Sequence, residues 1–214
     1  MSNTVNAEEQ RLSRIKRILA LAKSGAHFGE SDFDRERYDE IADICNVLLA
    51  ELAHTQPLPM NEFIPDYGAS YATPLLDVRG GLFRGDKILL VQEKADSRWT
   101  LPGGYADIGY SLTENIAKEM SEEASVQVRV TRICAIVHKA KRAYRPDTRD
   151  FYKVFCLCED LQPELEPEAG METRGAGFFG LDELPPLSTG RVIQEDIERM
   201  FHYAHNPSLA PELD

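Results

Sequence analysis

The spacing of apolar residues changes near residue 60, and this change constrains the fold more than any other feature. Before it, apolar residues recur every three or four positions, which predicts amphipathic helices. After a proline-bearing stretch at residues 55–68, they form short runs or alternate with polar residues, which predicts strands. The sequence therefore predicts a helical N-terminal domain over residues 1–60 and a larger domain over residues 66–206.

Two helices are expected in the first domain. Their apolar stripes consist of Leu12, Ile15, Leu19 and Ala22 in the first helix, and Tyr38, Ile41, Cys45, Leu48 and Leu52 in the second. A pair of helices is too small to bury both stripes completely, so it must pack on the rest of the chain or on a second copy. We expect a homodimer with these helices at its interface, and packing within one chain is the alternative.

The larger domain reads as strands interrupted by a helix at about 112–124 and closed by another at about 191–204. The apolar runs of the strands include "KILLVQ", "ICAIV" and "FYKVFCLC". The strands and helices show no regular β-α-β repeat. The pattern predicts a mixed α/β or α+β sandwich.

Charge and apolar content exclude some classes of protein. The formal net charge is −12, from 24 basic and 36 acidic residues, which argues against a protein that grips nucleic acid through a basic surface. The apolar runs are far shorter than the roughly 20 residues that cross a bilayer, and the N-terminus has no apolar signal-peptide core. We expect a cytoplasmic protein without a membrane partner. Its four cysteines fit no metal-site spacing, and we expect Cys156 and Cys158 to be small core residues on one face of a strand.

Three glutamates crowd one predicted helix. Ser111 and Glu114 have the spacing of a capping box, which places the helix start at Ser111. At roughly 100° per residue, Glu119, Glu122 and Glu123 fall within an arc of about 100° just after the glycine turn "LPGG". Such carboxylates need either full solvation or a cation, and three of them with a glycine carbonyl would provide the oxygen ligands that Mg²⁺ prefers.

Residues 103–126 resemble the Nudix box, G-x5-E-x7-R-E-U-x-E-E-x-G-U, where U is a bulky apolar residue. Gly104 matches the first glycine, and Glu119, Glu122 and Glu123 match the glutamates of the metal helix. Departures occur at Tyr110 for glutamate, Lys118 for arginine and Ser125 for glycine. Asp107 is a candidate to replace part of the missing acid, and Ser125 stands where a helix end often needs a left-handed residue.

The whole chain is similar to Nudix proteins with a helical N-terminal domain, which include CDP-choline and ADP-ribose pyrophosphatases. The resemblance implies a Nudix-type α/β/α sandwich with a mixed sheet. It also implies metal-dependent hydrolysis of a nucleoside diphosphate linked to a group X, giving a nucleoside monophosphate and phosphoryl-X. The cofactor would be Mg²⁺ or Mn²⁺, and the partner a small-molecule nucleoside diphosphate derivative.

The resemblance also assigns roles to residues. The metal ligands would be Gly104, through its carbonyl, with Glu119, Glu122 and Glu123. The catalytic residues would be Glu119, Glu123 and Glu172, with Glu119 or Glu172 as the general base. A solvated loop acid is the alternative reading of Glu172.

Basic residues concentrate at 139–149, between two predicted strands. We expect this segment to contact substrate phosphates and Tyr144 to stack on a base; a solubilising loop is the alternative. The substrate-binding candidates are Arg79, Arg84, Lys139, Arg142 and Tyr144.

Two other functions remain open. Because of its three departures from the box, the chain is alternatively a non-catalytic nucleotide-binding or regulatory module with the same fold. A Nudix-fold isomerase or an RNA-end processing enzyme is a third reading, and the acidic net charge weakens its RNA version.

Overall fold

The fold is taken from a computed structural model that describes residues 2–29, 31–52, 73–107 and 109–214. The chain divides into two compact units. Unit 1 comprises Met1–Pro74 and Pro146–Asp150, and unit 2 comprises Leu75–Arg145 and Phe151–Asp214. The predicted linker and the domain boundaries near residue 60 lie outside the described residues.

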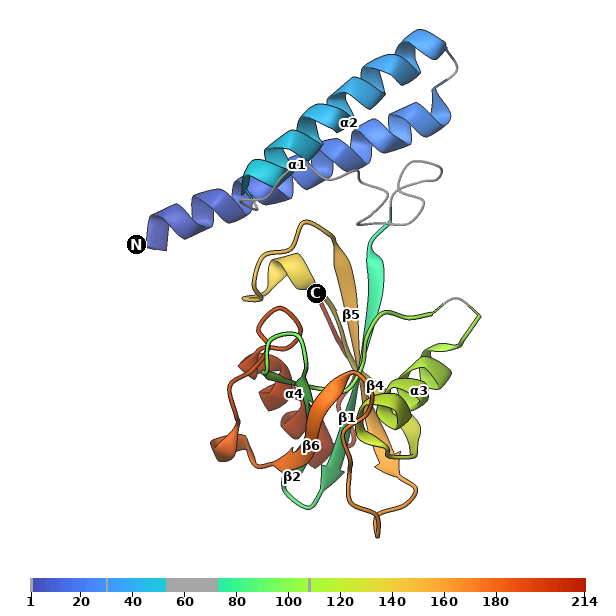
Figure 1. Cartoon of the computed structure of the whole chain (residues 1–214), viewed down its shortest axis with the longest axis vertical. Helices are drawn as coiled ribbons and strands as arrows, with labels where there is room; N and C mark the ends of the chain where they lie inside the picture. Colours follow the sequence, from blue (N-terminus) through green and yellow to red (C-terminus); the bar gives the residue numbers. More distant parts are fainter. Residues whose placement is uncertain (1, 30, 53–72, 108) are drawn as a thin grey trace. The chain divides into compact units, whose positions relative to one another are not determined.

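Unit 1 contains the two predicted helices, α1 (Ser2–Phe28) and α2 (Asp32–Leu52) (Figure 1). Their shared core consists of Leu19, Ala22, Ala42, Cys45 and Leu49, with Leu12, Ile15 and Tyr38 packed against it. Two members of the predicted stripe differ from expectation, because Ile41 and Leu48 are each 39% exposed. One helix can cover only a narrow strip of its neighbour, so the rest of each apolar face stays open.

Unit 2 is built on a mixed sheet. Its strands are β1 (Leu75–Arg84), β2 (Lys87–Glu93), β3 (Trp99–Thr100), β4 (Val128–His138), β5 (Phe151–Asp160), β6 (Thr173–Phe179) and β7 (Glu212–Leu213). They lie in the order β3-β2-β1-β5-β4-β7, with β6 paired to β2. The pairs β1–β5 and β4–β7 are parallel and the other pairs are antiparallel.

Helices α3 (Leu112–Ala124) and α4 (Gln194–His205) cover opposite faces of this sheet (Figure 1). Alternation along β2 shows the two layers, because Ile88 and Leu90 enter the core under α4 while Leu89 and Val91 enter the core under α3. Short 3-10 turns, η2 (Lys139–Lys141) and η3 (Leu181–Glu183), complete the unit. The predicted α/β sandwich with a mixed sheet and an N-terminal helical region is confirmed.

Local signals set both ends of α3. The Ser111 side chain accepts from the backbone N–H of Glu114, and the Glu114 side chain accepts from the backbone N–H of Ser111. This is the predicted capping box. At the other end, Ser125 adopts the left-handed conformation with φ 58° and ψ 29°. Glycine, which the box has at this position, would adopt this left-handed conformation without strain.

The four cysteines form no disulfide bonds. All four cysteines have free thiols, and Cys156 and Cys158 pack on the α3 side of the sheet, as small apolar residues do. Within the described ranges, no helix combines the length and the apolar character that crossing a membrane requires.

We predict that Ser125→Gly stabilises the protein. A left-handed backbone costs an L-residue about 1–2 kcal/mol, and the larger entropy that glycine loses on folding offsets part of the gain. The free energy of unfolding, measured by urea denaturation, should rise by about 0.5 kcal/mol or more. The same change at Ser121, an exposed position inside α3, is the control and should lower that free energy by about 0.5–1 kcal/mol. Equal effects at both serines would contradict the left-handed backbone conformation at Ser125.

Candidate active site

Strand β1 holds the glycine turn at residues 101–104 through its backbone. The N–H of Val78 donates to the Gly104 carbonyl at 2.8 Å, and the N–H of Gly80 donates to the Pro102 carbonyl at 3.0 Å. These bonds tie the turn to a central strand of the sheet.

The turn brings two carboxylates of α3 together. Gly103 has φ +139°, and a Cβ added there would lie 2.0 Å from the carbonyl oxygen of Val78, so glycine is required. Its N–H donates to Glu123 Oε2 at 2.9 Å. A Cβ at Gly104 would lie 3.0 Å from Glu119 Oε1, which places the Glu119 carboxylate against that glycine.

Burial makes these carboxylates hard to ionise. Glu123 is 6% exposed, and burial raises its pKa to about 7 against the opposing effects of Arg79 and the Gly103 N–H. Burial also raises the pKa of half-buried Glu119, and the nearby Lys118 charge opposes that rise. The negative charge of Glu119 further raises the pKa of Glu123. A cation bound between them would remove this repulsion.

Glu122 lies differently from the other two glutamates. Its Oε2 is 3.2 Å from Lys118 Nζ, which also donates to Asp107 Oδ2 at 3.0 Å. Asp107 thus provides an acid beside Lys118, while the side chain of Tyr110, at the box position of the missing glutamate, is exposed. Lys118 therefore holds Glu122 and Asp107 together, and it contributes a charge but no guanidinium fork.

The loop before β6 packs on the end of α3. Thr173 Oγ1 and the N–H of Gly170 both donate to the Glu123 carbonyl, at 2.7 and 3.2 Å. Glu172 lies between them in sequence and is exposed, and its charge raises the pKa of both Glu93 and Glu119. The structure therefore brings Glu172 into the same electrostatic neighbourhood as the box glutamates.

Glu93 belongs to this acidic group, and the sequence analysis missed it. It ends β2, is buried, and has a pKa raised chiefly by burial despite Arg191, whose Nε lies 2.9 Å from Glu93 Oε1. Its charge in turn raises the pKa of Glu123. The available signal was alternation, because Glu93 follows Leu89 and Val91 at two-residue spacing, but its neighbours on other elements depend on which strands pair.

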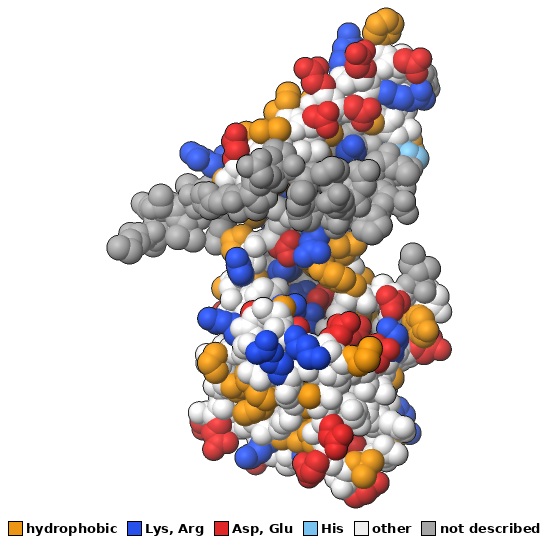
Figure 2. Space-filling view, viewed as in Figure 1, with side chains coloured by type: hydrophobic (Ala, Val, Ile, Leu, Met, Phe, Trp, Pro, Cys, Tyr) orange, Lys and Arg blue, Asp and Glu red, His pale blue; other side chains and the backbone are white. Residues whose placement is uncertain are grey.

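Basic side chains surround the turn between β2 and β3, again outside the sequence-based candidates. Arg174 donates to Ser97 Oγ at 3.0 Å and Arg98 donates to the Leu187 carbonyl at 3.3 Å, so both hold neutral partners there. On this face of unit 2, Lys and Arg side chains gather over the β2 and β6 region (Figure 2). Positive charge therefore lies beside Glu93 and Arg191 in an otherwise acidic chain.

The donor set fits a divalent cation when substrate supplies further ligands. Across the part of the chain that the structure describes, no three His, Cys, Asp or Glu side chains are arranged to hold a metal ion. The carboxylates of Glu119 and Glu123 are oxygen ligands of the kind Mg²⁺ uses. The Gly104 carbonyl oxygen, which already accepts one hydrogen bond from Val78, has a second lone pair for a metal ion. Mg²⁺ commonly binds through one or two carboxylates and fills its remaining positions with water and substrate phosphates.

Arg79 is the substrate-binding candidate that lies near the acids. Its charge acts on Glu123 and Glu93, but its side chain is buried. Nε and Nη2 donate to the Asp77 carboxylate at 2.9 Å each, and Nη1 donates to the Leu101 carbonyl at 3.0 Å. Arg79 thus joins β1 to the start of the glycine turn.

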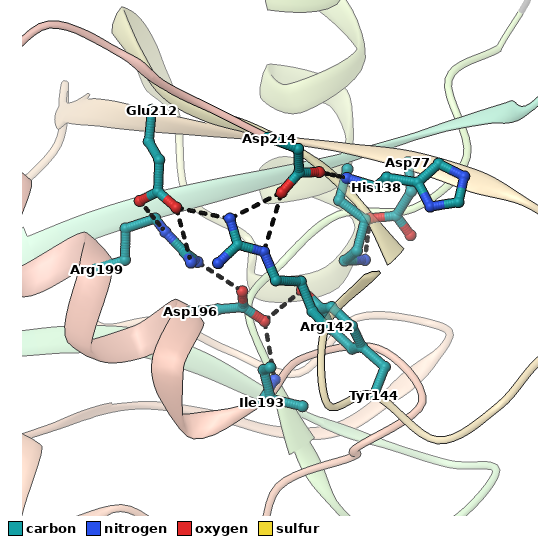
Figure 3. A network of polar contacts seen from close by, with 10 residues as sticks. Asp77, His138, Arg142, Tyr144, Ile193, Asp196, Arg199, Glu212 and Asp214 are labelled. Atoms are coloured by element: carbon teal, nitrogen blue, oxygen red, sulfur yellow. Dashed lines mark hydrogen bonds and ion pairs between the residues drawn. The ribbon is translucent and has the colours of Figure 1, made fainter. Parts of the chain in front are cut away.

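Arg142 and Tyr144 lie in a network of polar contacts (Figure 3). Arg142 donates to Glu212 and Asp214, and Tyr144 donates to Asp196 at 2.6 Å. Tyr144 is 6% exposed and its ring packs over Lys153, which argues against the expected stacking on a base.

The last two substrate-binding candidates have contacts of their own. Lys139 is buried, with Nζ 4.8 Å from the centre of the Phe151 ring. Arg84 lies at the far end of β1, where it pairs with Asp160 at 2.9 Å and stacks on the Phe178 ring. The structure therefore does not gather the five candidates at one point.

Comparisons with known proteins agree with this geometry. Residues 75–200 match the NUDIX domain, and residues 9–63 match the family described as a UDP-X-like, N-terminal oligomerisation domain. A Bacillus subtilis (strain 168) protein, YjhB, whose name assigns it provisionally to the ADP-ribose pyrophosphatases, is 35% identical over 213 residues. These cover 98% of this chain and 100% of that protein.

Two solved structures are also similar. An ADP-ribose pyrophosphatase from Streptococcus suis 89-1591 shares 39% identity with a TM-score of 0.60, covering 66% of this chain and 100% of its own. A UDP-X diphosphatase shares 29% identity with a TM-score of 0.61, covering 97% of this chain and 99% of its own. The chain therefore belongs to the Nudix hydrolase family. It is a Nudix hydrolase of the phosphoric-anhydride-cleaving class, preceded by a Nudix N-terminal helical region.

We predict that Gly103→Ala disrupts the turn. The added methyl group would overlap the Val78 carbonyl, in addition to the strain of a positive φ. Gly109→Ala is the matched control, because Gly109 has φ +92° with no atom within 4 Å of the added Cβ. Backbone strain alone should cost Gly109→Ala about 1–3 kcal/mol, and Gly103→Ala should lower the free energy of unfolding further. Equal losses in thermal denaturation would show that the close approach to Val78 is unimportant.

Proposed function

We propose that the protein hydrolyses a nucleoside diphosphate linked to a group X, with ADP-ribose as the first candidate and CDP-choline and UDP-linked compounds next. The products would be a nucleoside monophosphate and phosphoryl-X. The observation that carries the proposal is the convergence of Glu119 and Glu123 on Gly103 and Gly104. The names of the similar B. subtilis and S. suis proteins favour ADP-ribose.

The roles of residues follow from their positions. Glu119, Glu123 and the Gly104 carbonyl would hold Mg²⁺ or Mn²⁺, with Glu122 contributing from the edge where Lys118 holds it. Bound there, a divalent cation would screen the diphosphate charge and polarise the phosphorus. Glu172 or Glu119 would accept a proton from the attacking water.

Phosphate oxygens of the substrate that do not bind the metal ion need hydrogen-bond donors. The exposed basic side chains around the β2–β3 turn can provide them. The side chains of Arg98 and Arg174 donate to neutral oxygens, and the charge of Arg98 also acts on Asp96. Both side chains are exposed, so they can also donate to an anion. We propose them as phosphate contacts in place of Arg84, whose charge is balanced by Asp160.

We predict that Glu123→Gln abolishes metal-dependent turnover. The change keeps shape and burial but removes a ligand charge, so kcat/KM for ADP-ribose should fall about 100-fold or more. Product phosphate esters are measured with Mg²⁺ or Mn²⁺ on ADP-ribose, CDP-choline and UDP-glucose. Because Glu122 is shared with Lys118, Glu122→Gln should cost about 10-fold or less.

Absence of turnover by folded wild type across the panel would favour the non-catalytic nucleotide-binding module. Turnover that survives Glu123→Gln would reject the metal assignment. An RNA with a 5′ triphosphate is assayed beside the panel, and turnover of that RNA alone would favour the RNA-processing reading.

The general base is assigned by separating metal affinity from turnover. Replacing a residue that is only the base should lower kcat and leave Mn²⁺ affinity intact. Replacing a ligand, as Glu119 is proposed to be, should lower both whether or not it is also the base, so Glu172→Gln decides between the two. Glu172→Gln and Glu119→Gln are compared, with Mn²⁺ binding followed by electron paramagnetic resonance. If Glu172→Gln retains full kcat, Glu119 becomes the candidate.

We further propose that the protein is a homodimer assembled through α1 and α2. Beside the buried core of this pair, the two helices expose further apolar side chains, among them Ile18, Leu21, Ile41, Ile44, Val47 and Leu48. In α2, Ile41, Ile44 and Leu48 follow helical spacing and form one stripe. The family description of residues 9–63 as an oligomerisation domain supports a second copy as the partner.

We predict that Ile44→Glu dissociates this dimer, because it places a charge within the apolar stripe. Sedimentation velocity at micromolar concentration should show a monomer for the variant and a dimer for wild type. Asp43→Gln, at the adjacent exposed position of α2, is the control and should remain dimeric. A wild-type monomer would reject the assembly.

A further inference from the structure

Lys153 is a buried lysine that no role above uses. It lies in β5 directly opposite Asp77 of β1, with a side chain 1% exposed. Its ammonium group donates to the Asp77 carboxylate and lies 5.5 Å from the centre of the Tyr144 ring. Burial lowers its pKa to about 8 against the attraction of Asp77. Burying the lysine ammonium group costs free energy of desolvation that an apolar residue would not cost. Its burial therefore indicates a role that needs its charge.

Asp77 is already paired without Lys153. Both of its oxygens accept from Arg79, at 2.9 Å each, in the two-pronged geometry that fixes a guanidinium plane. Burial alone would raise the pKa of Asp77, but Arg79 and Lys153 outweigh it and keep the pKa below its ordinary value. The second cation therefore holds the carboxylate from the β5 side, while Arg79 holds it from its own strand.

The guanidinium nitrogen of Arg79 that does not bind Asp77 reaches the glycine turn. Nη1 donates to the Leu101 carbonyl at 3.0 Å and approaches Thr100 Oγ1 at 3.4 Å. The backbone of β1 holds the next parts of the turn, as described above, and Gly103 in turn donates to Glu123. A line of contacts therefore runs from Lys153 through Asp77 and Arg79 to the turn.

We propose that Lys153 and Asp77 are positioning residues: they orient Arg79, which holds the Leu101 carbonyl so that the turn presents the Gly103 N–H to Glu123. Arg79 then acts on the active site through the turn, and contact with substrate phosphate is not its role. The kinetic consequence rests on the proposed function, whereas the order of the turn does not.

The first test measures the order of the turn directly. Backbone hydrogen exchange is followed by mass spectrometry in wild type, Lys153→Met and Arg79→Lys. Exchange over residues 101–104 should rise about 10-fold in both variants, with exchange in β2 unchanged. Arg79→Lys keeps the charge but cannot hold Asp77 and Leu101 at once. Wild-type exchange of the turn in either variant would overturn the proposal.

The second test separates kcat from KM with the substrate turned over by wild type. A displaced turn should lower kcat by about 10–100-fold with KM changed less than about 3-fold, because substrate contacts remain. The control is Arg132→Lys, which makes the same replacement elsewhere in unit 2. Arg132 lies in β4, and its guanidinium donates to the Tyr203 and Asn206 carbonyls. It should leave both kcat and turn exchange at wild-type values. A rise in KM alone would overturn the proposal and return Arg79 to direct substrate binding.

A third variant guards against misfolding of the first two. Replacing the whole charged set, as Asp77→Leu, Arg79→Met and Lys153→Met together, removes three mutually paired charges at once, and such exchanges are often neutral or stabilising. Because Glu123 also loses the opposing charge of Arg79 in this variant, the order of the turn is its deciding readout. The triple variant should fold, show raised exchange over residues 101–104 and retain little kcat. A folded triple variant with a protected turn would overturn the proposal. If wild type turns over nothing, the proposed function fails and hydrogen exchange alone decides this inference.

Discussion

The arrangement of the candidate site depends on the close approach of the glycine turn to β1. At Gly103 the backbone comes so near to the Val78 carbonyl that no side chain fits, and the same residue donates its N–H to Glu123. One residue therefore sets both the distance from turn to sheet and the direction of a buried carboxylate. Without that approach, α3 would still fold from its own capping signals, but its acids would have no fixed counterpart.

The electrostatic character of the site follows from that geometry. Glu93 and Glu119 lie close enough to Glu123 for their charges to raise its pKa. Burial, nearly complete at Glu93 and Glu123 and partial at Glu119, raises the pKa of each of the three. Arg79 and Arg191 offset part of the charge from within the fold. A site with this excess of buried negative charge favours divalent cations and, through them, a phosphorylated ligand.

The sequence was a good guide wherever the determinants are local. The start of α3 at Ser111, the left-handed backbone at Ser125 and the two layers of the sandwich all follow from spacing, capping and apolar alternation. The roles of Glu93 and Lys153 could not be predicted, because each depends on which strands become neighbours. Tyr144 shows the same limit, since a basic segment looks exposed in sequence while one of its aromatic rings is buried.

Unit 1 includes the segment Pro146–Asp150, which lies in sequence within the hydrolase half of the chain. Lys16 of α1 donates to the carbonyls of Asp147 and Arg149 and to the carboxylate of Asp150. The chain thus passes between the two units three times rather than once. An exchange of the N-terminal helices alone would remove the lysine that these groups bind, so the β4–β5 connection is structurally part of the helical unit.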